Sequence, residues 1–84
     1  MSDPKTISHF LDITGDVCPL TFVRTKLRLA RMASGEILEI RLNAGEPLDN
    51  VPRSAAELGH GVEVLGPEDP ALPEGVHRIR ICKS

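Results

Sequence analysis

The sequence predicts an α+β two-layer sandwich in which two helices pack on one face of a β-sheet. Four segments alternate apolar and polar residues as half-buried strands do, and two segments repeat apolar residues at helical spacing. Their order along the chain is β-α-β-α-β-β. Because each helix offers one apolar face and each strand has a polar side, the simplest packing puts both helices on one face and leaves the other face wetter.

Size and charge favour one small cytoplasmic domain. The chain has 84 residues and a formal net charge of -2, so we expect a single domain over residues 7–84 behind a disordered lead of residues 1–6. The negative net charge argues against direct nucleic-acid binding, which needs a basic surface. Apolar stretches are far shorter than the roughly 20 residues of a membrane span, and no signal-peptide core is present.

The first half of the chain predicts a strand, a tight connection and a helix. Residues 10–13 alternate as a strand does, and residues 14–17 form the connection. The helix is expected over residues 19–33 and ends at Ser34-Gly35. Its core-facing residues are expected to be those that recur at helical spacing, which are Leu20, Val23, Leu27 and Ala30.

The second half predicts three strands and one short helix. The strands are expected at residues 36–42, 62–65 and 76–82. The helix is expected over residues 51–58, with Asp49 or Asn50 as N-cap, Pro52 in the first turn and Gly59 at its end. Its apolar face would consist of Val51, Ala55 and Leu58.

The connection into the first helix carries the candidate chemistry. Proline is favoured at the first helical position, so Pro19 there makes Cys18 the N-cap, where Ser, Thr, Asp or Asn would stabilise the helix better. An N-cap thiol faces the N–H groups of Leu20 and Thr21 and the positive end of the helix dipole, which favour the nucleophilic thiolate. Asp16 acts in the opposite direction. The alternative is that Cys18 is a small, half-buried apolar residue that happens to precede a helix.

Two cysteines, Cys18 and Cys82, are too few for a disulfide framework. In a reducing compartment both are expected to be thiols. Because no second cysteine lies close in sequence, a lone nucleophile at Cys18 fits group carrying better than disulfide exchange. Cys82 shares one side of its strand with Arg78 and Arg80 and is expected to be structural or semi-exposed.

The segment LDITGDVCPL, residues 11–20, resembles the signature of the TusA-like (SirA-like) sulfur carrier family. The similarity continues through residues 34–40, 46–52 and 57–60, and so covers nearly the whole chain beyond the lead. The family pattern usually has a second proline at the position of Thr21. That departure leaves the thiol chemistry intact and bears on the choice of partner and on any role in tRNA thiolation.

The resemblance implies both a sheet and an activity. The sheet would be mixed and four-stranded, in order 1-2-4-3, with strand four antiparallel and two helices on one face. Cys18 would accept sulfane sulfur as a persulfide from a cysteine desulfurase or a rhodanese-like donor and pass it to an acceptor protein, with Gly15 and Pro19 as motif residues. Family acceptors serve tRNA thiolation, cofactor assembly or sulfur oxidation.

Arg24, Arg28 and Arg31 recur at i, i+4 and i+7 and form what we call the arginine stripe. The stripe could dock an acidic donor or acceptor next to Cys18. The alternative is a solvated helix face whose arginines favour the C-terminal end of the helix.

No metal or cofactor is expected, because the histidines lack partners at ligand spacing and no glycine-rich phosphate loop is present. Two classes of function therefore stand beside each other: a sulfurtransferase or persulfide carrier, and a non-catalytic protein-interaction or regulatory module of the same fold. A redox-sensing thiol is a third, which would show oxidation without sulfur loading.

Overall fold

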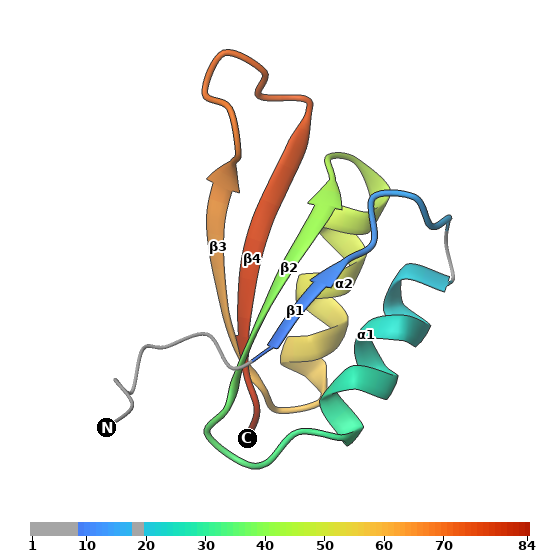
Figure 1. Ribbon diagram of the computed structural model, residues 1–84, viewed down its shortest axis with the longest axis vertical. Helices are drawn as coiled ribbons and strands as arrows, with labels where there is room; N and C mark the ends of the chain where they lie inside the picture. The colour runs from blue at the N-terminus through green and yellow to red at the C-terminus, as the bar shows by residue number, and fades with distance from the viewer. Residues whose placement is uncertain (1–8, 18–19) are drawn as a thin grey trace.

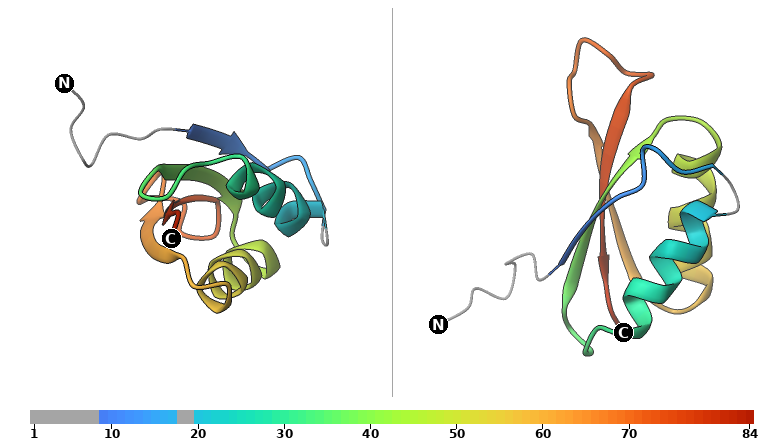
Figure 2. Two further views of the ribbon diagram at one scale, coloured as in Figure 1. Left: turned by 90° about the horizontal axis from the view of Figure 1, so that it is seen from below. Right: turned by 45° about the vertical axis from the view of Figure 1, so that its right-hand side comes forward.

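The computed structural model describes residues 9–17 and 20–84 as a four-stranded sheet with two helices on one face (Figure 1, Figure 2). The elements are β1 (His9–Asp12), α1 (Leu20–Ala30), β2 (Ile37–Asn43), α2 (Glu46–Glu57), β3 (Gly61–Pro67) and β4 (Val76–Cys82). The predicted two-layer α+β class and the order β-α-β-α-β-β are confirmed. The predicted lead, residues 1–6, lies outside the described residues.

The sheet is mixed and its strand order is β1-β2-β4-β3. β1 lies parallel to β2, with Leu11 opposite Ile40. β4 is antiparallel to both of its neighbours, and its Ile79 lies opposite Ile40 on β2 and Val64 on β3. This order confirms the sheet implied by the family resemblance. The β3–β4 hairpin extends past the ends of both helices (Figure 1).

The core lies between the sheet and the helices. Alternate residues of β2 and β4 point into it and have no exposed surface, as the strand pattern predicts. These core side chains are Leu38, Ile40, Leu42, Ile79 and Ile81. From the helices, Val51 and Ala55 of α2 and Leu29 of α1 complete the same cluster.

The prediction that Leu20, Val23, Leu27 and Ala30 face the core is wrong. The buried residues of α1 are Thr21, Thr25 and Leu29. Burying the hydroxyl of Thr25 costs little because it donates to the Thr21 carbonyl at 2.9 Å. Both series recur at helical spacing, so periodicity alone could not distinguish them.

Helix α1 also ends earlier than predicted. It closes at Ala30, and the N–H groups of Arg31 and Met32 donate to carbonyls three residues earlier, at 3.0 and 3.1 Å. Such bonds tighten a last turn and satisfy carbonyls that would otherwise lack partners. Met32 is buried, so the chain beyond the helix still contributes to the core.

Helix α2 begins five residues before its predicted start, so Asp49 and Asn50 lie inside it and neither is the N-cap. Gly45, with a φ of 96°, occupies the N-cap, and Pro47 takes the favoured early position. Pro52 is therefore an interior proline and not a first-turn one. Proline at 47 is the stronger start signal, and the sequence prediction assigned that role to the wrong proline.

The C-terminal end of α2 agrees with the prediction. Gly59 has a φ of 94°, and the N–H of His60 donates to the Ala55 carbonyl at 3.2 Å. This is the left-handed glycine cap that commonly ends helices. Val51 and Ala55 are buried as predicted, whereas Leu58 is exposed.

The open face of the sheet carries three arginines that we call the sheet arginines, Arg41, Arg78 and Arg80. Glu39 accepts hydrogen bonds from Arg78 and Arg80 at 2.8 and 3.1 Å. Glu68 accepts from Arg41 and Arg78, both at 2.7 Å. Each sheet arginine is thus paired within the chain.

Hydrogen bonds and ion pairs hold two carboxyl groups in their charged form, Asp12 and Glu68. Asp12 accepts from the Thr14 hydroxyl and N–H and from Arg41, which lowers the pKa of Asp12 from 3.8 to about 2. Hydrogen bonds from Arg41 and Arg78 lower the pKa of Glu68 from 4.5 to about 2.

Candidate functional site

The segment that leads from β1 toward α1 is fixed where it leaves the sheet. Asp12 Oδ1 accepts from the N–H and the hydroxyl of Thr14, at 2.9 and 2.6 Å. Asn43 Nδ2 donates to the Thr14 carbonyl at 2.8 Å, and the buried Ile13 donates its N–H to the Arg41 carbonyl at 2.9 Å. Side chains of β1 and β2 therefore anchor the start of the connection, as a short Asx-turn does.

The next residues include the motif glycine and the acidic residue before the thiol. Gly15 is exposed, and a Cβ there would meet nothing within 4 Å, so space alone does not explain the glycine. Asp16 forms an ion pair with Arg24 of α1, and its N–H donates to the Ile13 carbonyl at 3.1 Å. Asp16 was expected to oppose a thiolate at Cys18; the Arg24 guanidinium offsets that charge.

Cys18 and Pro19 lie outside the described residues, so their positions as N-cap and first helical residue stay predictions. The residues on either side of them are exposed, Val17 by 71% and Leu20 by 52%. The Leu20 N–H donates to the Val17 carbonyl at 2.8 Å. The N–H of Leu20, one of the two predicted donors to the thiol, thus has an acceptor within the described residues.

Thr21, the departure from the family pattern, belongs to the interior side of α1. Its side chain is buried, and its carbonyl accepts the Thr25 hydroxyl. A change at this position therefore alters packing beneath the helix as well as the backbone donor next to Cys18.

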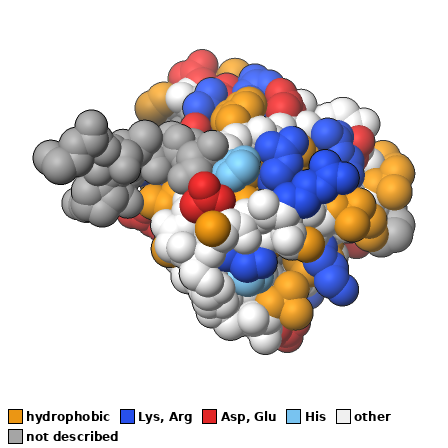
Figure 3. All heavy atoms as spheres, turned by 60° about the horizontal axis from the view of Figure 1, so that its bottom comes forward, with side chains coloured by type: hydrophobic (Ala, Val, Ile, Leu, Met, Phe, Trp, Pro, Cys, Tyr) orange, Lys and Arg blue, Asp and Glu red, His pale blue; other side chains and the backbone are white. Residues whose placement is uncertain are grey.

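The arginine stripe borders a small hollow between β1 and α1. The hollow has a volume of ≈ 170 Å³ and is lined by Leu11, Arg24, Leu27, Arg28 and Arg31. Figure 3 shows Lys and Arg side chains gathered together with hydrophobic side chains beside them. The structure thus brings the three predicted arginines to one place.

The three arginines differ in their contacts. Arg24 pairs with Asp16. Arg28 donates to the Phe10 carbonyl of β1 at 3.5 Å, a long contact. Arg31 is exposed and has no carboxylate partner among the described residues. Two members of the stripe are therefore available for outside anions with little competition from the chain.

Beside the stripe lies an apolar surface that the sequence prediction placed in the core. Leu20, Val23 and Leu27, which we call the outer ridge, are exposed by 52%, 43% and 60%. One signal could have revealed it: at 100° per residue, Arg31 lies only about 40° from Leu27 around the helix. A core-facing side would not carry an arginine at that position.

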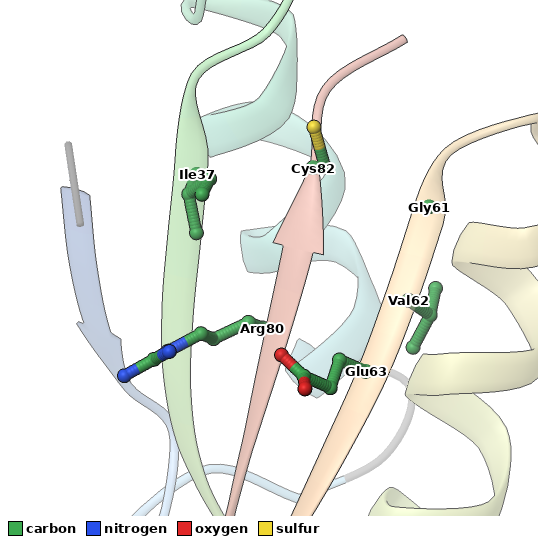
Figure 4. A pocket seen from close by; sticks show the side chains of 6 residues that line it. All are labelled: Ile37, Gly61, Val62, Glu63, Arg80 and Cys82. Carbon is green, nitrogen blue, oxygen red and sulfur yellow. The ribbon is translucent and has the colours of Figure 1, made fainter. Parts of the chain in front are cut away.

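Cys82 lies at another pocket, on the open face of the sheet. The pocket has a volume of ≈ 340 Å³ and is lined by Ile37, Gly61, Val62, Glu63, Arg80 and Cys82. Figure 4 shows these side chains, with Arg80 extending across β2. Cys82, which was expected to be structural or semi-exposed, is exposed, and it pairs with Ile37, the first residue of β2. The connection after β1 starts from the opposite end of the sheet, because β1 runs parallel to β2.

Within the described part of the chain, no group of three or more His, Cys, Asp or Glu side chains could hold a metal ion. Neither of its helices is long and apolar enough to cross a membrane.

Comparison with known proteins gives a family match and several relatives. Residues 9–83 match the model of the family described as "Sulfurtransferase TusA". Proteins from Archaeoglobus fulgidus and Thermotoga maritima, both named "Putative sulfur carrier protein", are similar in sequence. The first is 50% identical over 61 residues, covering 73% of this chain and 67% of that protein. The second is 36% identical over 66 residues, covering 75% and 84%.

One solved structure supports the fold. The crystal structure of a SirA-like protein from Desulfitobacterium hafniense superposes with a TM-score of 0.73. The match covers 88% of this chain and 95% of that one at 23% sequence identity.

Proposed function

We propose that this chain, which belongs to the TusA sulfurtransferase family of sulfur carriers, carries sulfane sulfur as a persulfide on Cys18. The family match over residues 9–83 carries this proposal. The Cys-Pro motif that directly precedes α1 in the sequence, with exposed residues on either side of it, supports it further.

Sulfur transfer between a persulfide and a thiolate conserves atoms and electrons, so it requires no cofactor. The Cys18 thiolate attacks the terminal sulfur of a donor persulfide; a new S–S bond forms, the donor S–S bond breaks, and the donor cysteine leaves as a thiolate. The same exchange, with an acceptor thiolate as the attacking group, returns Cys18 to its thiolate form. The positive end of α1 and the Thr21 N–H favour the charged sulfur in both states.

Two protein partners are required, a sulfur donor of the cysteine desulfurase or rhodanese-like type and an acceptor protein, and we place the relay in the cytoplasm. The arginine stripe would guide them to Cys18, because rim charges mainly raise the rate of association. The ion pair between Arg24 and Asp16 fits this role, since it removes a negative charge from the approach.

Mass spectrometry of the intact protein tests the proposal. After incubation with a cysteine desulfurase and cysteine, the wild-type protein should gain the mass of one sulfur atom, and Cys18→Ser should gain none. Cys82→Ser is the matched control, since it removes the other thiol, and it should load like the wild type. Oxidation of Cys18 without sulfur gain would favour a redox sensor, and no modification would favour an interaction module.

A further inference from the structure

The outward face of α1 is apolar where a solvated helix would be polar. The outer ridge lies opposite the buried threonines of the same helix, and its three side chains are exposed by 43–60%. Val17, three residues before the helix begins, is also exposed, by 71%. The helix thus buries Thr21, Thr25 and Leu29 and presents Leu20, Val23 and Leu27 to solvent. Contiguous apolar surface of this kind marks interaction sites.

The same helix carries a one-sided charge. It contains no acidic residue and three basic ones, and a further arginine follows it, although the whole chain has a net charge of -2. The three arginines of the stripe line the hollow between β1 and α1, with Leu27 of the outer ridge at its rim. Apolar and cationic groups therefore border each other.

We propose that this face of α1 docks a protein segment that presents apolar side chains beside carboxylates. The apolar side chains cover the outer ridge, and the carboxylates enter the hollow lined by Arg28 and Arg31. The partner is the donor or acceptor of the sulfur relay, so the inference rests on the proposed function and specifies the chemistry of its partner.

The arrangement favours a protein over a nucleic acid. Arginines alone would suit phosphates, but single-stranded nucleic acids are bound with aromatic side chains for base stacking. The chain has two aromatic residues. Phe22 is half-buried against the core, and Phe10 lies under the Arg78 guanidinium on the open sheet face. The outer ridge therefore offers apolar contact without a stacking platform.

A symmetric pair of these faces is also disfavoured. In a two-fold dimer the same patch meets itself, which would bring two arginine stripes together. The carboxylate that the stripe needs must come from a different surface.

Selection from a displayed library of random peptides, on immobilised full-length protein, tests the inference. Enriched peptides should combine Asp or Glu with Leu, Ile or Phe. They should lose about tenfold or more in affinity for the double variant Val23→Ser, Leu27→Ser, as expected when central apolar contacts are removed. A similar loss is expected for Arg28→Gln with Arg31→Gln. Leu72→Ser and Arg53→Gln, which change exposed residues elsewhere, should bind like the wild type.

Several results would overturn the inference. One is that the enriched peptides lack acidic residues, and another is that they bind the double variant Val23→Ser, Leu27→Ser (the ridge variant) as tightly as the wild type. The others are failure to enrich any peptide that requires α1 and displacement of the peptide by single-stranded RNA. Self-association through α1, seen by sedimentation and lost in the ridge variant, would point to a second copy instead.

Loading of Cys18 from inorganic polysulfide separates this inference from the proposed function, because a small donor needs no docking surface. Ridge variants should load normally from polysulfide. If the wild-type protein fails to load while peptides still bind α1, the carrier function is wrong and the docking surface stands. If the protein loads and no peptide binds α1, the docking surface alone is rejected.

Discussion

Two groups of three arginines lie on different surfaces, one on the open face of the sheet and one beside the hollow between β1 and α1, and their contacts differ. Every sheet arginine has at least one carboxylate partner within 3.1 Å. In the arginine stripe Arg24 alone has a carboxylate partner among the described residues, and Arg28 and Arg31 border a hollow with apolar neighbours. The sheet arginines are satisfied by the fold, whereas the stripe leaves cationic donors for something outside it. The first group is thus structural, and the second is the candidate for partner binding.

The largest effect should come from breaking the network of the sheet arginines. Glu39 is 5% exposed and accepts from two guanidinium groups. Glu39→Ala should lower the free energy of unfolding in urea by about 2–3 kcal/mol, because it leaves Arg80 without its carboxylate acceptor and removes one of the two acceptors of Arg78. Asp49→Ala, which removes an exposed ion pair with Arg53, is the control and should have little effect. Equal losses in the two variants would show that the network is ordinary solvated surface.

Reversing charge in the stripe should affect transfer and not folding. Arg28→Glu with Arg31→Glu should slow sulfur transfer from the donor protein by about tenfold or more at low salt, and the difference should shrink as salt rises. Arg24 is left intact because it also pairs with Asp16. Lys26→Glu with Arg53→Glu makes the same charge change elsewhere and is the control. Unchanged transfer at low salt would make the stripe a solvated helix face.

Acid should weaken the fold through the carboxylates of the sheet network. The pKa of Asp12 and that of Glu68 fall to about 2 in the folded chain, from ordinary values of 3.8 and 4.5. A group with a lowered folded pKa contributes stability above its unfolded pKa, and that stability is lost as pH falls toward the folded value. Stability should therefore decline between about pH 5 and pH 2. Asp12→Asn with Glu68→Gln should flatten this decline in urea titrations; an unchanged slope would contradict the assignment.

The smallest predicted effect concerns Thr21. With Cys18 as N-cap, Thr21 is the third helical residue, whose N–H normally bonds the capping side chain. Thr21→Pro removes that N–H and should raise the pKa of the Cys18 thiol, because a hydrogen bond to the charged form lowers a pKa. The pH dependence of Cys18 alkylation measures it, with circular dichroism to confirm folding. An unchanged or lower pKa in a folded variant would show that this donor does not reach the sulfur.

The strands could be predicted from the sequence because apolar and polar residues alternate along them, so burial of one face determines which residues point into the core. Val76–Cys82 was predicted to the residue, and the sheet order followed from the family resemblance. The orientation of α1 could not be predicted in the same way. A buried Thr25 becomes acceptable only when its hydroxyl reaches the Thr21 carbonyl, and an exposed Leu27 is informative only beside Arg28 and Arg31. Both depend on neighbours that hydrophobic spacing does not reveal.

Peptide mapping of the sulfur-loaded protein tests the carrier role of Cys18 most directly, because the two thiols are expected at opposite ends of the sheet. Cys82 pairs with the first residue of β2, whereas Cys18 follows the far end of β1 in sequence. After loading by a cysteine desulfurase and alkylation, the extra sulfur should be found on the Cys18 peptide alone and should leave when an acceptor thiol is added. Sulfur on Cys82, sulfur that no thiol removes, or a Cys18–Cys82 disulfide in the folded protein would contradict this role.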